Sequence, residues 1–175
     1  MPLNDAEGDH LAGVVVEYQL IPAEIERARA KNHVSADEID LRMSCFDMPV
    51  HLSIAGLELL KWEYIPILAV AIEMPRAVRQ LRAFGAEKWD FSPFHGSAIA
   101  LRLTGSDVEA RPPFSAEVAR APFAALAEAV GRFSRQIRAD LLAEIPGFRD
   151  HDELGAWFRG KVEVPLGDEW EPSPP

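Results

Sequence analysis

Cysteine is almost absent from the sequence, and its single example, Cys45, excludes an internal disulfide framework. Long apolar runs are absent too. The longest, Ile65–Ile72, contains Pro66 and is much shorter than the roughly 18 apolar residues of a membrane span. The first ten residues carry three acids and neither lysine nor arginine, whereas a secretory signal begins with basic residues. These absences predict a cytoplasmic protein that does not associate with membranes.

Basic residues are outnumbered by acids. The chain of 175 residues holds 28 acids and 18 bases, a formal charge of −10, and its isoelectric point is near 4.9. This balance argues against broad binding to nucleic acids or anionic membranes, which attract basic proteins. The excess lies at the ends, because residues 1–40 carry nine acids and three bases and residues 161–175 carry four acids and one base. Acidic surface of this kind can steer a basic partner toward the protein.

The motifs of catalysis and ligand binding are missing as well. The sequence has no Gly-x-Ser-x-Gly nucleophile elbow, no phosphate-binding loop and no Gly-x-Gly-x-x-Gly dinucleotide fingerprint. None of the five histidines has a second histidine or the cysteine at zinc-ligand spacing. We expect His51 to be a solvated or packed strand residue and the acids around His151 to begin a helix. The sequence therefore predicts no catalytic residue, no metal ligand and no cofactor.

Hydrophobic periodicity predicts a mixture of strands and helices. Alternation of apolar and polar residues is typical of a half-buried strand, and an apolar residue every three or four positions is typical of a helix. The predicted strands are Gly13–Leu20, Glu38–Phe46 with Cys45 on its apolar face, Val50–Ile54 with a return from Leu57 after a turn at Ala55-Gly56, Trp89–Phe94, Ala98–Thr104 and Val108–Arg111. The predicted helices are Pro22–Asn32, Pro122–Glu144 and a short last helix that contains Trp157 and Phe158 and begins at a capping box of Asp150 and Glu153.

The segment Tyr64–Phe84 permits two interpretations. Its first apolar residues share one helical face, whereas those after Pro75 would lie on the other side of a straight helix. Proline removes a backbone donor and clashes with the preceding turn, so we predict a kink or break at Pro75 that lets both faces reach the core. A strand over Ile67–Ile72 is the competing prediction.

The order of these elements predicts the fold class. Strands joined by short turns form antiparallel sheets, and the helices between and after them can cover one face. We predict an α+β fold of two layers, a mainly antiparallel sheet with helices packed on one face. Residues 12–160 would form one domain, and residues 1–11 and 161–175 would be flexible acidic segments.

Arginines recur along two of the predicted helices. They step by three residues at Arg76, Arg79 and Arg82 and again at Arg132, Arg135 and Arg138. Two such helices could form an anion-binding face despite the acidic total. We favour the alternative that these arginines are solvated and form ion pairs with nearby acids such as Glu73, Glu128 and Asp140.

The general layout resembles that of the small, acidic, cytoplasmic immunity proteins that neutralise bacterial polymorphic toxins. The resemblance rests on size, on charge and on the run from Met48-Pro49-Val50 through Pro146-Gly147. Many of those proteins are single α+β domains without a catalytic constellation, so the resemblance implies a toxin inhibitor. It assigns no functional residue, and the acidic ends would suit a basic toxin such as a nuclease.

We therefore predict a non-enzymatic protein that binds another protein. The predicted partner-binding residues combine acids with one large aromatic side chain: Asp37, Glu38, Asp40, Asp47 and Trp62. One alternative is an enzyme or small-ligand binder with a pocket near Pro75. Another is a structural subunit or homodimer that uses an exposed sheet edge or the helix bearing Trp157 and Phe158.

Overall fold

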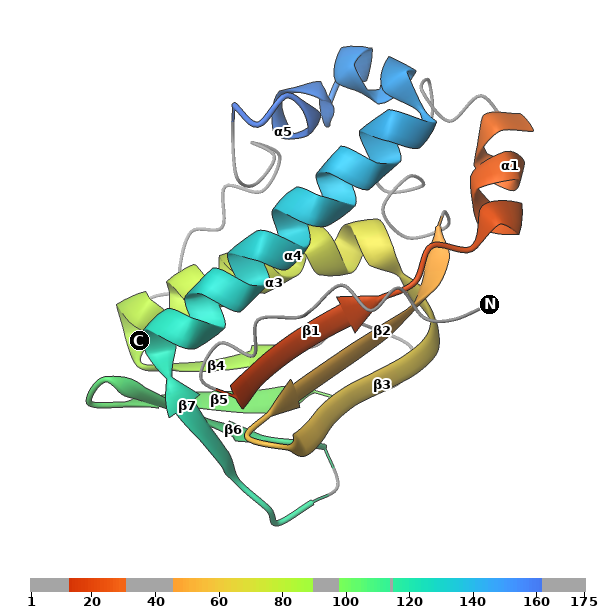
Figure 1. Ribbon diagram of the computed structural model, residues 1–175. Coiled ribbons are helices and arrows are strands. Elements are labelled where there is room, and N and C mark those ends of the chain that lie inside the picture. Colours follow the sequence, from red (N-terminus) through yellow and green to blue (C-terminus); the bar gives the residue numbers. More distant parts are fainter. Residues whose placement is uncertain (1–12, 31–45, 90–97, 114, 162–175) are drawn as a thin grey trace.

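Two antiparallel sheets and a layer of helices make up the structure (Figure 1). The computed structural model describes residues 13–30, 46–89, 98–113 and 115–161, and at 62–63 and 87–89 it describes the backbone alone. The longest helices lie on one side of the sheets (Figure 1). The predicted α+β class is confirmed, with the strands divided between two sheets.

The first sheet has the order β1-β2-β3. Its strands are β1 Val14–Tyr18, β2 Asp47–Ile54 and β3 Leu57–Pro66. Along β2 buried and half-buried residues alternate strictly, which is the period of a strand with one face on the core. Ala55 and Gly56 join β2 to β3 and have φ values of 50° and 80°. Two successive residues with positive φ form the tight hairpin turn whose twist matches its strands, so the predicted hairpin is confirmed.

The second sheet has the order β4-β5-β6-β7. Its strands are β4 Ala86–Trp89, β5 Ile99–Thr104, β6 Asp107–Arg111 and β7 Ala119–Pro122. The strand predicted over Trp89–Phe94 begins earlier than expected, and its residues 90–94 lie outside the described part of the chain. β7 was not predicted, because it has no β-branched or aromatic side chain. Its backbone is extended through antiparallel pairing with β6. The strand predicted over Glu38–Phe46 lies, up to Cys45, outside the described residues.

The helices are α1 Pro22–Ala30, α3 Ile67–Phe84, α4 Phe123–Glu144, the 3-10 helix η3 Pro146–Asp150 and the short α5 Gly155–Phe158. α4 begins within one residue of its predicted start and ends where predicted. α3 contacts strands of both sheets, and α4 contacts α3, β1, β6 and β7. The two helices therefore close one continuous hydrophobic cluster over both sheets. The terminal segments 1–11 and 162–175 lie outside the described residues.

α3 corrects the prediction for the segment around Pro75. The helix runs without a break from Ile67 to Phe84, so the predicted break and the competing strand are both wrong, whereas the kink at Pro75 stays a prediction. Residues on both sides of Pro75 are fully buried, for example Ile72 and Leu81. Their burial offsets the roughly 3 kcal/mol that a proline costs inside a helix. Phe84, which was expected to reach the core, is 58% exposed at the end of the helix.

A polar contact holds the first sheet to α4. The hydroxyl of Tyr18 donates a hydrogen bond to Asp140, whose other carboxylate oxygen accepts one from Gln136 at 2.9 Å. The Tyr18 ring packs edge-on against Phe133 with ring centroids 5.6 Å apart. Burial, and then the hydrogen bond and negative charge of Asp140, raise the pKa of Tyr18 well above its ordinary range.

Candidate functional site

The outer surface of the first sheet gathers acids from all three of its strands. Glu17 on β1 and Glu58 on β3 flank His51 on β2, with carboxylate oxygens 3.6 Å from its Nδ1 and 3.5 Å from its Nε2. Asp47 belongs to the same outward-facing set of β2 residues as His51, because side chains alternate along a strand. The side chains of Glu17 and Glu58 are 67% and 53% exposed. We call Glu17, Asp47 and Glu58 the acidic face.

Among the described residues, one lysine pairs with an acid of the acidic face. Lys61 lies opposite His51 in the sheet register, and its Nζ is 3.9 Å from Glu58. The Lys61 side chain is 72% exposed, so this is a surface ion pair that contributes little energy. The acidic face therefore keeps an excess of negative charge.

The outer surface of the second sheet carries the opposite sign. Exposed arginines project from its last three strands: Arg102 on β5, Arg111 on β6 and Arg120 on β7. Arg120 pairs with Glu109 at 2.6 Å, and Asp107 is the other acid on these strands. The net charge of the sequence therefore does not reveal that the outer surface of the first sheet is acidic and that of the second sheet is basic.

Of the predicted partner-binding residues, Asp47 alone has a described side chain. Asp47 lies on the same face of the sheet as Glu17 and Glu58, but four residues along β2 from His51, which both glutamates flank. Neither glutamate was predicted. Trp62 lies on β3 opposite Val50, and its side chain is outside the described part. The remaining three lie in the undescribed segment 31–45: Asp37, Glu38 and Asp40. Strand pairing between residues far apart in sequence creates the acidic face, so periodicity alone could not reveal it.

The C-terminal half of α4 and η3 form an open hollow of about 400 Å³. Six residues line it: Arg135, Arg138, Ala139, Leu142, Ala143 and Arg149. We call this feature the arginine groove. The five α4 residues recur at three- and four-residue steps and so form one stripe along the helix. Half of the lining residues are arginines and none is acidic.

Most of the other helix arginines have local partners, as the favoured alternative predicts. Arg132 pairs with Glu128 at 3.3 Å, and Arg76 pairs with Glu73 at 3.7 Å. Asp140 was expected to pair with an arginine, but its carboxylate oxygens accept hydrogen bonds from Tyr18 and Gln136. The second triplet is therefore split, with Arg132 in an ion pair and the other two arginines in the groove. Arg149, which completes the groove, stands alone in the sequence and gave no signal.

His151 has a structural role beside the groove. It is 3% exposed, and its Nδ1 accepts hydrogen bonds from the backbone of Glu153 at 3.2 Å and of Leu154 at 3.1 Å. The predicted helix start is wrong, because Asp150 ends η3 and α5 begins only at Gly155 without a side-chain cap. His151 instead holds the turn that leads into α5. His51 is half-exposed on its strand, as predicted.

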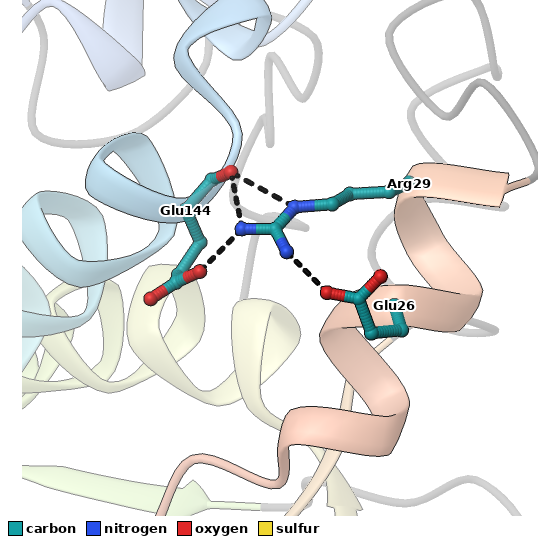
Figure 2. A network of polar contacts seen from close by, with 3 residues as sticks. All are labelled: Glu26, Arg29 and Glu144. Carbon is teal, nitrogen blue, oxygen red and sulfur yellow. Dashed lines mark hydrogen bonds and ion pairs between the residues drawn. The ribbon is translucent and has the colours of Figure 1, made fainter.

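A second polar network joins α1 to the end of α4 (Figure 2). The Arg29 guanidinium donates to the backbone oxygen of Glu144 at 3.0 Å and pairs with its carboxylate at 2.5 Å. Arg29 also pairs with Glu26 on its own helix. A cation at a helix C-terminus stabilises the exposed carbonyls there, so Arg29 both caps α4 and pairs with Glu144, which follows the groove residue Ala143 on the chain.

The structure bears on two alternative functions. Trp157 and Phe158 are 0% and 1% exposed, so the expectation that α5 presents them to a partner is wrong. The hollow described above lies on α4 and η3, and a ligand pocket near Pro75 stays a prediction. Among the described residues, no group of three His, Cys, Asp or Glu side chains could hold a metal ion. None of the helices described has the length and apolar character needed to cross a membrane.

Comparison of the chain with protein-family models, with curated proteins and with solved structures found no match.

Proposed function

We propose that the protein is a non-enzymatic binder of another protein and that the acidic face is its contact surface. The observation that carries the proposal is the gathering of Glu17, Asp47 and Glu58, from three different strands, on one solvent-facing side of a sheet. A paired sheet is a rigid platform, so little conformational entropy is lost when a partner docks on it.

The charge of the acidic face specifies the chemistry of the partner. Carboxylates that are more than half exposed attract a basic surface over about one Debye length, roughly 8 Å at physiological salt. Such complementarity raises the association rate and selects against acidic partners. The partner we propose is therefore a protein with a basic patch that fits a shallow sheet face.

The more specific form of the proposal is an immunity protein that neutralises a toxin domain. It is supported by the resemblance in size, charge and layout described above. A basic toxin, such as a nuclease, would present the cationic surface that the acidic face requires.

The test compares two charge-neutralising variants of the full chain. In E17Q/D47N/E58Q the acidic face loses its charge with little change in shape, and R102Q/R111Q/R120Q is the matched control on the other sheet. A partner is first captured by crosslinking in the native cells with the unaltered protein, then purified, and its association rate is measured with all three proteins.

We expect the acidic-face variant to associate about tenfold more slowly at low salt, and the difference to vanish near 0.5 M salt because the charges are then screened. The arginine variant should associate at the native rate or faster. If the acidic-face variant binds as fast as the native chain, or if the captured protein is acidic, the proposal is wrong. The immunity form additionally requires that the native chain, and not the acidic-face variant, abolish the partner's toxicity on co-expression.

A further inference from the structure

Two arginines of the arginine groove, Arg135 and Arg149, form no ion pair with the described acids around it. On α4, Asp140 is bound by Tyr18 and Gln136, Glu144 by Arg29, and Glu128 by Arg132. Within the described residues, no acidic side chain pairs with Arg135 or Arg149. Both arginines are exposed, so their charges face whatever enters the groove.

The floor of the groove is apolar. Ala139, Leu142 and Ala143 lie on the same stripe of α4 as the two helix arginines. A ligand that fits must therefore combine carboxylates or other anions with small apolar groups. Guanidinium groups favour carboxylates because their fork of donors matches two oxygens.

The chain itself leaves the described structure at the margin of this groove. Arg138 donates to the backbone oxygen of Trp157 at 3.2 Å, and a Cβ on Gly160 would lie 3.4 Å from Arg138 Nη2. Arg159 donates to the backbone oxygen of Arg149. Two arginine contacts thus fix the end of α5 against the residues that line the groove, and Lys161 follows directly.

The residues after Lys161 have the composition that the groove requires. Segment 162–175 holds four acids and no base: Glu163, Asp168, Glu169 and Glu171. Its other residues include apolar Val164 and Leu166. The stripe from Arg135 to Ala143 is about 12 Å long at 1.5 Å per helical residue, and ten extended residues reach about 33 Å. The segment therefore reaches the whole groove.

We propose that the arginine groove is the binding site of the chain's own acidic C-terminal segment, residues 162–175. Its carboxylates pair with Arg135 and Arg149, and its apolar residues contact the floor formed by Leu142 and its neighbours. Because the segment is tethered at the groove, it acts at a millimolar effective concentration and occupies the site ahead of dilute external anions. Exposed ion pairs of this kind are weak and screened by salt, so occupancy falls as ionic strength rises.

Hydrogen exchange of the full chain, read by mass spectrometry on peptides from segment 162–175, tests this proposal. At low salt we expect exchange about fivefold slower in the native chain than in R135E/R149E, because a few weak ion pairs hold the segment. High salt should remove the difference. Two controls should exchange like the native chain: R102E/R111E, with the same charge change elsewhere, and E17Q/D47N/E58Q on the acidic face. The second control separates this proposal from the proposed function.

A charge swap and a phosphate titration complete the test. Adding D168K/E169K/E171K to R135E/R149E should restore protection, since opposite charges again face each other. Inorganic phosphate, titrated against the Arg135 and Arg149 Nε–H signals, should bind the E163Q/D168N/E169Q/E171Q variant about fivefold more tightly than the native chain. The proposal is overturned if the native segment exchanges as fast as an unfolded peptide, if R135E/R149E leaves its protection intact, or if phosphate binds both chains equally.

Discussion

Removal of the Tyr18 hydroxyl gives a prediction with two separate signatures, one at neutral and one at alkaline pH. In Tyr18→Phe the ring keeps its edge-on contact with Phe133, whose centroid is 5.6 Å away, so packing is conserved. Asp140 keeps its hydrogen bond from Gln136 at 2.9 Å but loses the one from the hydroxyl. A hydrogen bond to a charged acceptor contributes roughly 1.5–3 kcal/mol, and for this half-buried pair we expect a loss near the low end, about 1.5 kcal/mol at pH 7.

The alkaline signature follows from the direction of the pKa shift. Burial and the contact with Asp140 raise the pKa of Tyr18 in the folded protein above that in the unfolded chain. The stabilisation is therefore complete below about pH 10 and is lost above it, because the unfolded state then releases a proton that the folded state retains. Above pH 10 the native chain should lose up to about 1.4 kcal/mol per pH unit through this group, a loss that the variant lacks.

Urea unfolding of both chains between pH 7 and pH 11 measures the effect. The difference in free energy of unfolding should shrink from about 1.5 kcal/mol at pH 7 to near zero at about pH 11. Tyr64→Phe is the matched control, since Tyr64 is the second of the two tyrosines and is 68% exposed; it should change nothing at any pH. A difference between the Tyr18 variant and the native chain that stayed constant with pH would refute the argument.

Two further changes test local features. Ala55→Asn should stabilise the protein by about 0.5–1 kcal/mol, because Ala55 has a φ of 50° and asparagine tolerates this conformation in a tight hairpin turn. Ala55→Val should destabilise the protein. Thermal unfolding that ranks the two variants the other way would contradict the turn geometry. His151→Ala should lower the free energy of unfolding by about 2 kcal/mol, since two backbone donors lose Nδ1 in a buried site. His151→Asn, which offers an oxygen near the same place, should recover part of this loss, and equal urea midpoints for both variants would exclude this role of Nδ1 in the turn.

Local patterns in the sequence account for the elements that were predicted correctly. α4 carries one apolar stripe of more than six turns, and Pro146-Gly147 marks its end. The hairpin of β2 and β3 combines strict alternation with a turn that contains glycine. In each case the signal lies within one segment, so no distant contact is needed to interpret it.

Two features that the sequence did not predict, the unbroken course of α3 and the strand β7, depend on contacts between distant segments. α3 continues through Pro75 because the core buries side chains on both sides of it, a benefit that the helix sequence does not display. β7 exists through its pairing with β6. The same holds for the candidate site. Asp47 could be selected as an acid beside a strand, whereas the register of β1 and β2 brings Glu17 to the same face of the sheet. Arg149 joins the groove through the packing of η3 on α4.

Local pairing, more than net charge, determines the charge that each surface of this protein presents. The total of −10 suggests a uniformly acidic molecule, yet charges farther apart than about 10 Å are largely screened, so a docking partner responds to the nearest few side chains. Arg29 and Arg132 each pair with one acid of α4, and Tyr18 donates a hydrogen bond to the third, whereas none of these acids forms an ion pair with Arg135 or Arg149 of the groove. On the first sheet the reverse holds, because one lysine faces several carboxylates. The same chain can therefore offer an acidic face to a basic partner and a cationic groove to an acidic segment, with each surface addressed separately by mutation.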